Sequence, residues 1–131
     1  MQLTDALVLR AWLLAPFKIA GAFVIGGFGG ALAAGALDLW ETPVAGFVAA
    51  ALVVLCTYCV TPAHKILFSA LSLALGGVLA WWLLKNTTWP ENHPTLAYQL
   101  TLLPLWCTYI GGSVGMLGAI CLGIRSERPC P

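Results

Sequence analysis

The sequence predicts an all-α integral membrane protein: an up-down bundle of four transmembrane helices, preceded by a short interfacial N-terminal helix. Of the 131 residues, 60% are hydrophobic and 8% are charged, whereas soluble domains carry about 25% charged residues. The mean hydropathy of +0.92 excludes intrinsic disorder, which requires low hydrophobicity and high net charge. The charges also leave membrane-sized gaps, because none occurs from Thr95 to Ile124. We therefore expect residues 1–131 to form a single membrane domain.

The N-terminal third contains more apolar sequence than one membrane pass needs. Residues 6–40 would form a helix of about 52 Å, whereas about 20 residues cross the hydrocarbon core. Pro16 is the expected break, because proline lacks a backbone donor and clashes with the preceding turn. We therefore predict an interfacial helix over 4–15, where Arg10 and Trp12 suit the headgroups, and a first span over about 17–39. A secretory signal cut near Ala31-Leu32-Ala33 is an alternative, disfavoured by its length.

The next two spans are predicted at about 44–61 and 66–84. Thr42 can cap the second span, and Pro43 suits its first turn. Only four residues, 62–65, follow before the third span, so the two spans should form a tight antiparallel hairpin. The third span closes on Trp81 and Trp82, which suit a membrane interface.

The fourth span is predicted at about 101–124, after a polar loop over 86–100. Cytoplasmic loops are enriched in Lys and Arg, so an inside N-terminus gives the best agreement with the charges. This orientation predicts that both termini are cytosolic, in a bacterial inner membrane. Five cations then lie inside and Lys85 lies outside, the five being Arg10, Lys18, Lys65, Arg125 and Arg128.

Each predicted span carries small residues at four-residue spacing, which places them on one helical face. Such rows let helix backbones approach closely in lipid. We interpret them as the packing seams of a compact bundle, with self-association as an alternative use. The rows are Ala22, Gly26, Gly30 and Ala34; Gly46 and Ala50; Ser72, Gly76 and Ala80; and Gly111, Gly115, Ala119 and Gly123.

The candidate metal site consists of Cys56, Cys59, His64 and Cys121. These four lie near the predicted cytosolic ends of their spans, and thiolate and imidazole ligands suit a soft ion such as Cu(I) or Zn. The spacing permits such a site without requiring it. Cysteine is also a readily buried small apolar residue, and a purely structural role is the competing interpretation.

Two other groups of polar residues have possible functions. A passive pore could be lined by hydroxyls, although hydroxyls more often bond to their own helix. The outer loops could gather Asp38, Glu41, Glu91 and His93 into an acidic site, although a solvated loop is the ordinary outcome for such composition. The candidate pore hydroxyls are Ser69, Ser72, Thr101, Thr108 and Ser113.

The expected function is that of a non-catalytic accessory or oligomeric component of a membrane complex. The second to fourth spans lack the buried ionisable groups typical of ion-coupled transport, and the sequence contains no nucleotide-binding or hydrolase motif. A formal charge of +1 also disfavours nucleic acid as a partner. The expected partners are the lipid bilayer and either a second copy or a larger membrane protein. A small passive channel or transporter, or a cytosolic-face soft-metal site, is the alternative.

Overall fold

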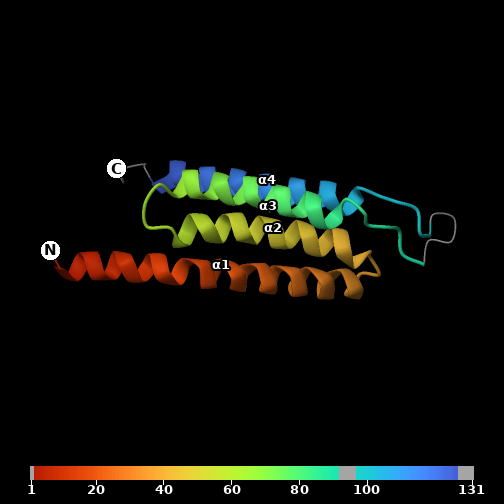
Figure 1. Ribbon diagram of the computed structural model, residues 1–131, viewed down its shortest axis with the longest axis horizontal. Coiled ribbons are helices and arrows are strands. Elements are labelled where there is room, and N and C mark those ends of the chain that lie inside the picture. Colours follow the sequence, from red (N-terminus) through yellow and green to blue (C-terminus); the bar gives the residue numbers. More distant parts are fainter. Residues whose placement is uncertain (1, 92–96, 127–131) are drawn as a thin grey trace.

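A computed structural model describes residues 2–91 and 97–126, and over these residues the chain consists of four helices and their connections. The helices are α1 (Gln2–Ala36), α2 (Glu41–Val60), α3 (Lys65–Leu84) and α4 (Leu103–Ser126). All four are long and apolar enough to cross a membrane, which confirms the prediction of four apolar helices. Consecutive helices run in opposite directions along the long axis (Figure 1).

Helix α1 is continuous through Pro16, so the predicted division into an interfacial helix at 4–15 and a separate span at 17–39 is wrong. Contacts on both sides of the proline account for the difference. Before it, the Trp12 ring packs on Phe68 of α3 with centroids 4.9 Å apart. After it, the Lys18 carbonyl accepts a weak bond from Cys56 Sγ of α2 at 3.7 Å. Neighbouring helices can support a proline-containing helix in this way.

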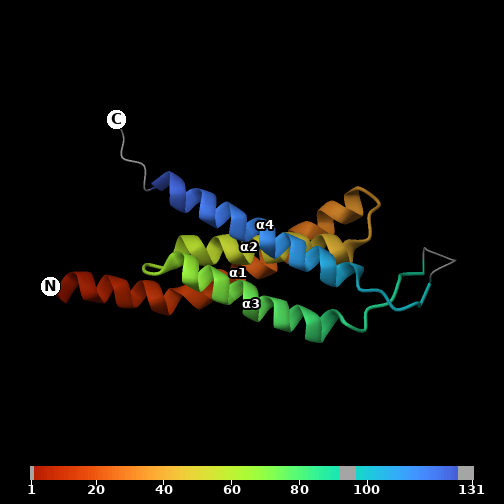
Figure 2. The same cartoon turned by 90° about the horizontal axis from the view of Figure 1, so that it is seen from above.

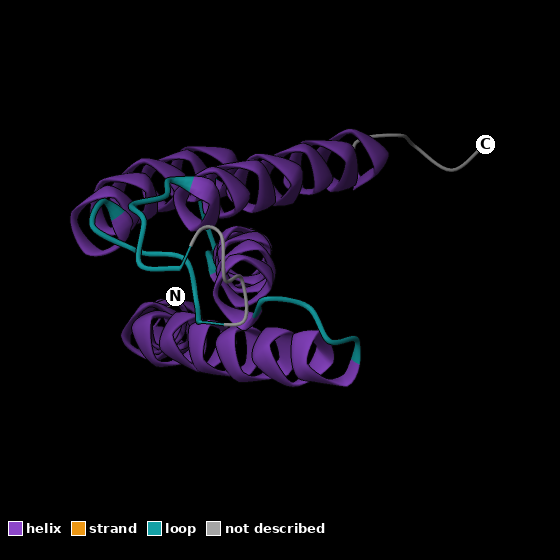
Figure 3. Cartoon of the chain, turned by 90° about the vertical axis from the view of Figure 1, so that its right-hand side faces the viewer, coloured by secondary structure: helices purple, strands orange, loops and turns teal. Residues whose placement is uncertain are grey.

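Helix α2 is the central element of the fold. Helix α1 lies on one side of it, and α3 and α4 lie on the other (Figures 1 and 3). Among the described helices, α1 approaches the backbone of α2 alone, whereas α2, α3 and α4 all pack against one another. The helices therefore do not close into the compact bundle that the sequence suggests. Seen from above, α1 and α4 cross α2 obliquely (Figure 2).

Local hydrogen bonds define the ends of the helices. Helix α1 ends where Leu39 N–H donates to the Ala34 carbonyl at 2.9 Å, with Asp38 in the left-handed region at φ 52°. His64 adopts a similar φ of 50° immediately before α3, where it reverses the chain after α2. The link between α3 and α4 contains an antiparallel bridge between Thr88 and Leu100.

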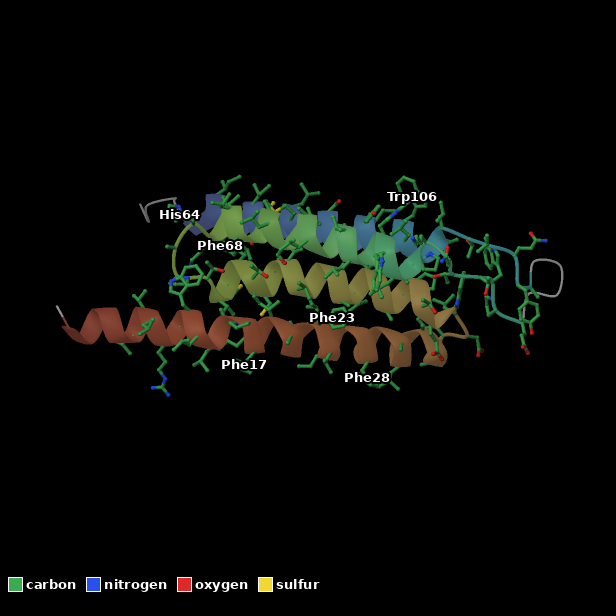
Figure 4. The ribbon with its side chains drawn as sticks, viewed as in Figure 1. Phe17, Phe23, Phe28, His64, Phe68 and Trp106 are labelled. Carbon is green, nitrogen blue, oxygen red and sulfur yellow. The ribbon has the colours of Figure 1, made fainter. Side chains whose placement is uncertain are left out.

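The buried core consists mostly of small side chains, and the large apolar side chains are on the outside. Phe17, Phe28 and Leu32 of α1 are 76%, 71% and 75% exposed. Phe28 lies on the side of α1 away from α2 (Figure 4). This arrangement inverts that of soluble proteins and is compatible with an integral membrane protein, because helices in lipid associate by close packing of small residues. The buried apolar side chains are Ala15, Ala34, Ala49, Val54, Ala80, Leu105 and Ala119.

Candidate functional site

The seam between α1 and α2 is built on two glycines of α1. A methyl group added at Gly26 would lie 2.8 Å from the Ala49 Cα atom, and one added at Gly30 would lie 2.8 Å from the Ala45 Cα atom. Both glycines are buried. The two pairs progress in opposite directions along the two helices, so this contact is antiparallel. The predicted seam of the first span is confirmed at these positions.

The seam between α2 and α4 uses glycines of α4 in the same way. A methyl group added at Gly111 would lie 2.7 Å from the Phe47 Cα atom, and one at Gly115 would lie 3.0 Å from the Ala51 Cα atom. These pairs progress in the same direction, so α2 and α4 pack parallel. Helix α2 therefore meets the glycines of α1 and the glycines of α4 through two different faces, and the predicted seam of the fourth span is confirmed at Gly111 and Gly115.

Helix α3 joins the other helices through hydroxyl groups. Ser69 Oγ donates to the Val54 carbonyl of α2 at 3.4 Å. Thr57 Oγ1 of α2 donates to Ser72 Oγ at 3.3 Å. Tyr109 of α4 donates to the carbonyl of Gly77 at 3.3 Å. By contrast, a methyl group added at Gly76 would meet nothing within 4 Å. The predicted third seam is therefore wrong at Gly76, which lies on the outer face of α3.

The hydroxyls considered as pore linings are engaged in bonds that fix the helices. Thr108 donates to the Pro104 carbonyl at 2.8 Å, and Ser113 donates to the Tyr109 carbonyl at 2.9 Å. Thr101 instead accepts a bond from the backbone N–H of Leu103 at 3.2 Å. Among the described residues, no buried side-chain nitrogen or oxygen lacks a partner. The geometry thus provides local structural roles for these hydroxyls.

The proposed thiol and imidazole ligands are not brought together. Over the described part of the chain, no group of three or more His, Cys, Asp or Glu residues could hold a metal ion. Cys56 is turned toward α1, where its Sγ atom contacts the Lys18 carbonyl, whereas Cys59 and Cys121 are exposed. His64 is also exposed, in the turn between α2 and α3. In this structure Cys56, Cys59, His64 and Cys121 are thus not gathered into one group, and the soft-metal site stays a prediction.

The connection between α3 and α4 is a folded hairpin-like segment over its described residues. Trp89 N–H donates to the Gln99 carbonyl at 3.0 Å, and Tyr98 N–H donates to the Trp89 carbonyl at 3.2 Å. The Trp89 ring packs on Trp40, with centroids 5.0 Å apart. This contact ties the link between α3 and α4 to the turn between α1 and α2.

The carboxylates suggested for an outer site take local roles where they are described. Glu91 accepts a hydrogen bond from the Tyr98 hydroxyl, and this bond raises the pKa of the Tyr98 phenol. Glu41 lies near Gly35 at the turn between α1 and α2. His93 lies outside the described residues. The described carboxylates do not gather into an ion site.

Two aromatic features at the opposite end were not anticipated from the sequence. Trp12 of α1 packs edge-on against Phe68 of α3, and Lys65 Nζ lies 5.6 Å from the ring centroid of Tyr58. A tryptophan near a membrane interface suggests anchoring in lipid, and nothing in the spacing of Trp12 and Phe68 indicates a contact between them. Only the helix arrangement brings these two rings together.

Comparison with known proteins assigns no family to this chain. The chain matches no protein-family model, and it shows no significant similarity to a curated protein or to a solved structure.

Proposed function

We propose that this chain is an integral membrane protein that crosses a bacterial inner membrane four times and serves as a non-catalytic component of a larger membrane complex. Its partner is a second copy or a larger membrane protein. The bilayer supplies the environment for the exposed apolar side chains described above. In water, these side chains would form an apolar surface far larger than monomeric soluble proteins carry.

The distribution of charge supports an orientation with both termini in the cytosol. The first turn of α1 and the last turn of α4 lie at the same end of the molecule (Figure 1). Helix α3 begins with Lys65 at this same end and is followed by Lys85 at the opposite end. Because cytoplasmic loops are rich in Lys and Arg, the end that carries the first turn of α1 and the last turn of α4 is the cytosolic one.

The observation that carries the proposal is the open position of α1. The backbone of this helix approaches α2 alone among the described helices, and its printed contact with another helix is that of the Trp12 ring with Phe68 of α3. Large side chains project there, among them Phe28 and Leu32, which are one helical turn apart and mostly exposed. Gly26 and Gly30 are used in the seam, and the bulky side chains on the outward face can contact lipid or another protein.

The test combines a double variant on α1 with a matched double variant on α3. Phe28→Ala with Leu32→Ala shortens two exposed side chains on α1, and Leu75→Ala with Leu79→Ala does the same on α3, where both are also exposed. We expect subunit counting by single-molecule photobleaching in native membranes, together with chemical cross-linking, to show an assembly of fixed stoichiometry. The α1 variant should dissociate it and the α3 variant should retain it.

Reconstitution into liposomes provides the second half of this test. A non-catalytic component without a pore should give no solute flux above that of empty liposomes. Monomeric chains in native membranes, or flux that depends on the chain, would contradict the proposal.

A further inference from the structure

We propose that two copies of this chain pair in the membrane through the outward face of α1, as a parallel two-stranded coiled coil that continues past the end of α2. The proposal rests on the proposed function and deepens it, since it names the second copy as the partner and α1 as the surface. Its support comes from the length of α1, from the side chains near its N-terminal end and from the spacing of apolar residues along it.

Helix α1 is longer than the helix on which it packs, and the extra length lies at one end. The contact between α1 and α2 is antiparallel, and at its inner end the Lys18 carbonyl contacts Cys56 Sγ. Helix α2 ends four residues after Cys56, at Val60, so its end is level with Leu14 of α1, four residues before Lys18. The preceding residues, 2–13, extend about 18 Å beyond α2 (Figure 1). We call residues 2–13 the α1 extension.

The α1 extension is too long for the inner headgroup layer to cover. Helices α2 and α3 have 20 residues each, which corresponds to about 30 Å and matches the hydrocarbon core. Each headgroup layer adds about 6 Å, whereas Leu7 lies about 10 Å past the end of α2 at the helical rise per residue. With the four-pass orientation, the tip of the extension therefore reaches the aqueous compartment.

Large apolar side chains surround this tip. Leu7, Val8 and Leu9 are consecutive, so they point in different directions around the helix, and they are 60%, 46% and 62% exposed. A helix that is apolar on nearly every side is normally buried, and lipid cannot cover a helix that projects into water. Contact with lipid accounts for the exposed side chains within the membrane but not for those of the tip. The tip therefore requires cover by protein.

The side of α1 opposite the seam has the spacing of a coiled coil. Apolar residues recur there at intervals of seven, with a second set three residues further on, and the large members of both sets are exposed. Phe17 and Phe28, one from each set, lie on the side of α1 away from α2 (Figure 4). A seven-residue repeat packs two helices along each other with a left-handed supercoil. The two sets are Leu7, Leu14, Gly21 and Phe28, and Phe17 and Val24.

A second copy is the partner that fits this surface. Two chains with the same orientation in one membrane have extensions of equal length that leave the bilayer at the same depth, so the extensions cover each other from base to tip. A methyl group added at Gly21 would meet nothing within 4 Å, so this glycine leaves room for a second backbone.

Arg10 also fits a two-stranded seam. It is exposed and occupies the second set, three residues after Leu7. A single cation at a core position of a coiled coil fixes register and strand number at a cost in stability. From a two-stranded seam, its long side chain still reaches water.

The experiment uses the full chain without its native cysteines, in native membranes, with one new cysteine at a time. Leu7→Cys lies in the proposed seam, and Leu9→Cys is its control, because both positions are exposed near the tip. Val24→Cys and Phe23→Cys make the same comparison within the membrane. Copper phenanthroline oxidises neighbouring thiols to a disulfide. Each seam variant should give a covalent dimer about tenfold faster than its control, because a disulfide requires Cα atoms within about 7 Å.

The possible results separate this pairing from the proposed function. Equal rates for Leu7→Cys and Leu9→Cys, in chains that photobleaching still shows to be assembled, would overturn the α1 pairing and leave the larger complex standing. Cross-linking of Leu7→Cys to a different protein would have the same meaning. Chains that are monomeric in native membranes would contradict both proposals. If Leu7→Cys fails to insert into the membrane, the comparison of Val24→Cys with Phe23→Cys decides.

Discussion

Helices α1 and α3 both pack against α2, but they do so by different chemistry. Helix α1 brings two glycines against the α2 backbone, so no side chain separates the two helices at Gly26 and Gly30. Helix α3 instead uses the hydroxyls of Ser69 and Ser72, in bonds with Val54 and Thr57. The contact of α1 depends on glycine having no side chain at the point of closest approach. The contact of α3 depends on separate hydrogen bonds, each of which one substitution can remove. A substitution should therefore cost much more at the glycine contacts than at the hydroxyls.

The largest effect is expected at the seam between α2 and α4. Gly111→Ala would place a methyl group within 2.8 Å of three backbone atoms of Phe47, and backbone cannot move aside as a flexible side chain can. We expect a loss of about 3 kcal/mol in unfolding free energy, at the upper end of overpacking costs. Thermal unfolding in mild detergent would show it. Gly76→Ala is the matched control, since its added methyl group meets nothing within 4 Å.

A smaller loss is expected at the seam between α1 and α2. Gly30→Ala would bring a methyl group 2.8 Å from the Ala45 Cα atom, with the next atoms at 3.2 Å. Since the backbone of α1 approaches α2 alone, α1 can shift outward, and we expect a loss of about 2 kcal/mol. The adjacent Gly29→Ala serves as the control, because it faces open space. Equal unfolding temperatures for the two variants would contradict the glycine-seam interpretation.

The hydroxyl contacts of α3 should be the weaker ones. Tyr109→Phe removes the bond to the Gly77 carbonyl and keeps the ring, and Ser69→Ala removes the bond to Val54. Hydrogen bonds between membrane helices contribute about 0.6 kcal/mol on average, so each variant should lose about that amount. A loss as large as that of Gly30→Ala, measured by the same unfolding assay, would remove the distinction between the two kinds of contact.

The smallest effect concerns the exposed pair of Tyr98 and Glu91. Because the hydrogen bond to Glu91 raises the pKa of Tyr98, the phenol should ionise above its ordinary value of about 10. The folded chain then holds this proton more tightly than the unfolded chain. The contribution of this hydrogen bond to folding stability is complete below the ordinary pKa of about 10 and is lost as pH rises through the raised pKa of Tyr98. The difference in tyrosinate absorbance between wild type and Tyr98→Phe would measure the pKa, and an ordinary value would contradict the bond.

The sequence predicted those parts of the fold that depend on composition and on periodicity along one helix. The apolar lengths located four helices, and the four-residue spacing identified Gly26, Gly30, Gly111 and Gly115 as seam residues. Pro16 misled the prediction, because its local cost is offset by contacts that involve Trp12 and distant parts of the chain. Local rules could not include those contacts.

The choice of neighbours could not be predicted in the same way. Small residues on a helix show that something packs closely there, but they do not say which helix does so. Gly76 has the same spacing as the seam glycines and faces outward. The cysteines illustrate the same limit, since Cys56 and Cys59 are near in sequence but differ in exposure. Whether Cys56, Cys59, His64 and Cys121 come together depends on the helix arrangement, which the spacing along the sequence does not contain.

The most direct test of the central claim, that four helices cross the membrane with the two ends of the bundle in different compartments, is cysteine accessibility. A chain without native cysteines would carry either Ala63→Cys in the turn between α2 and α3 or Thr88→Cys after α3, both exposed positions and both uncharged. An impermeant maleimide should label residue 88 in intact cells and residue 63 only after lysis. Labelling of both residues in intact cells, or of neither, would contradict the four-pass arrangement.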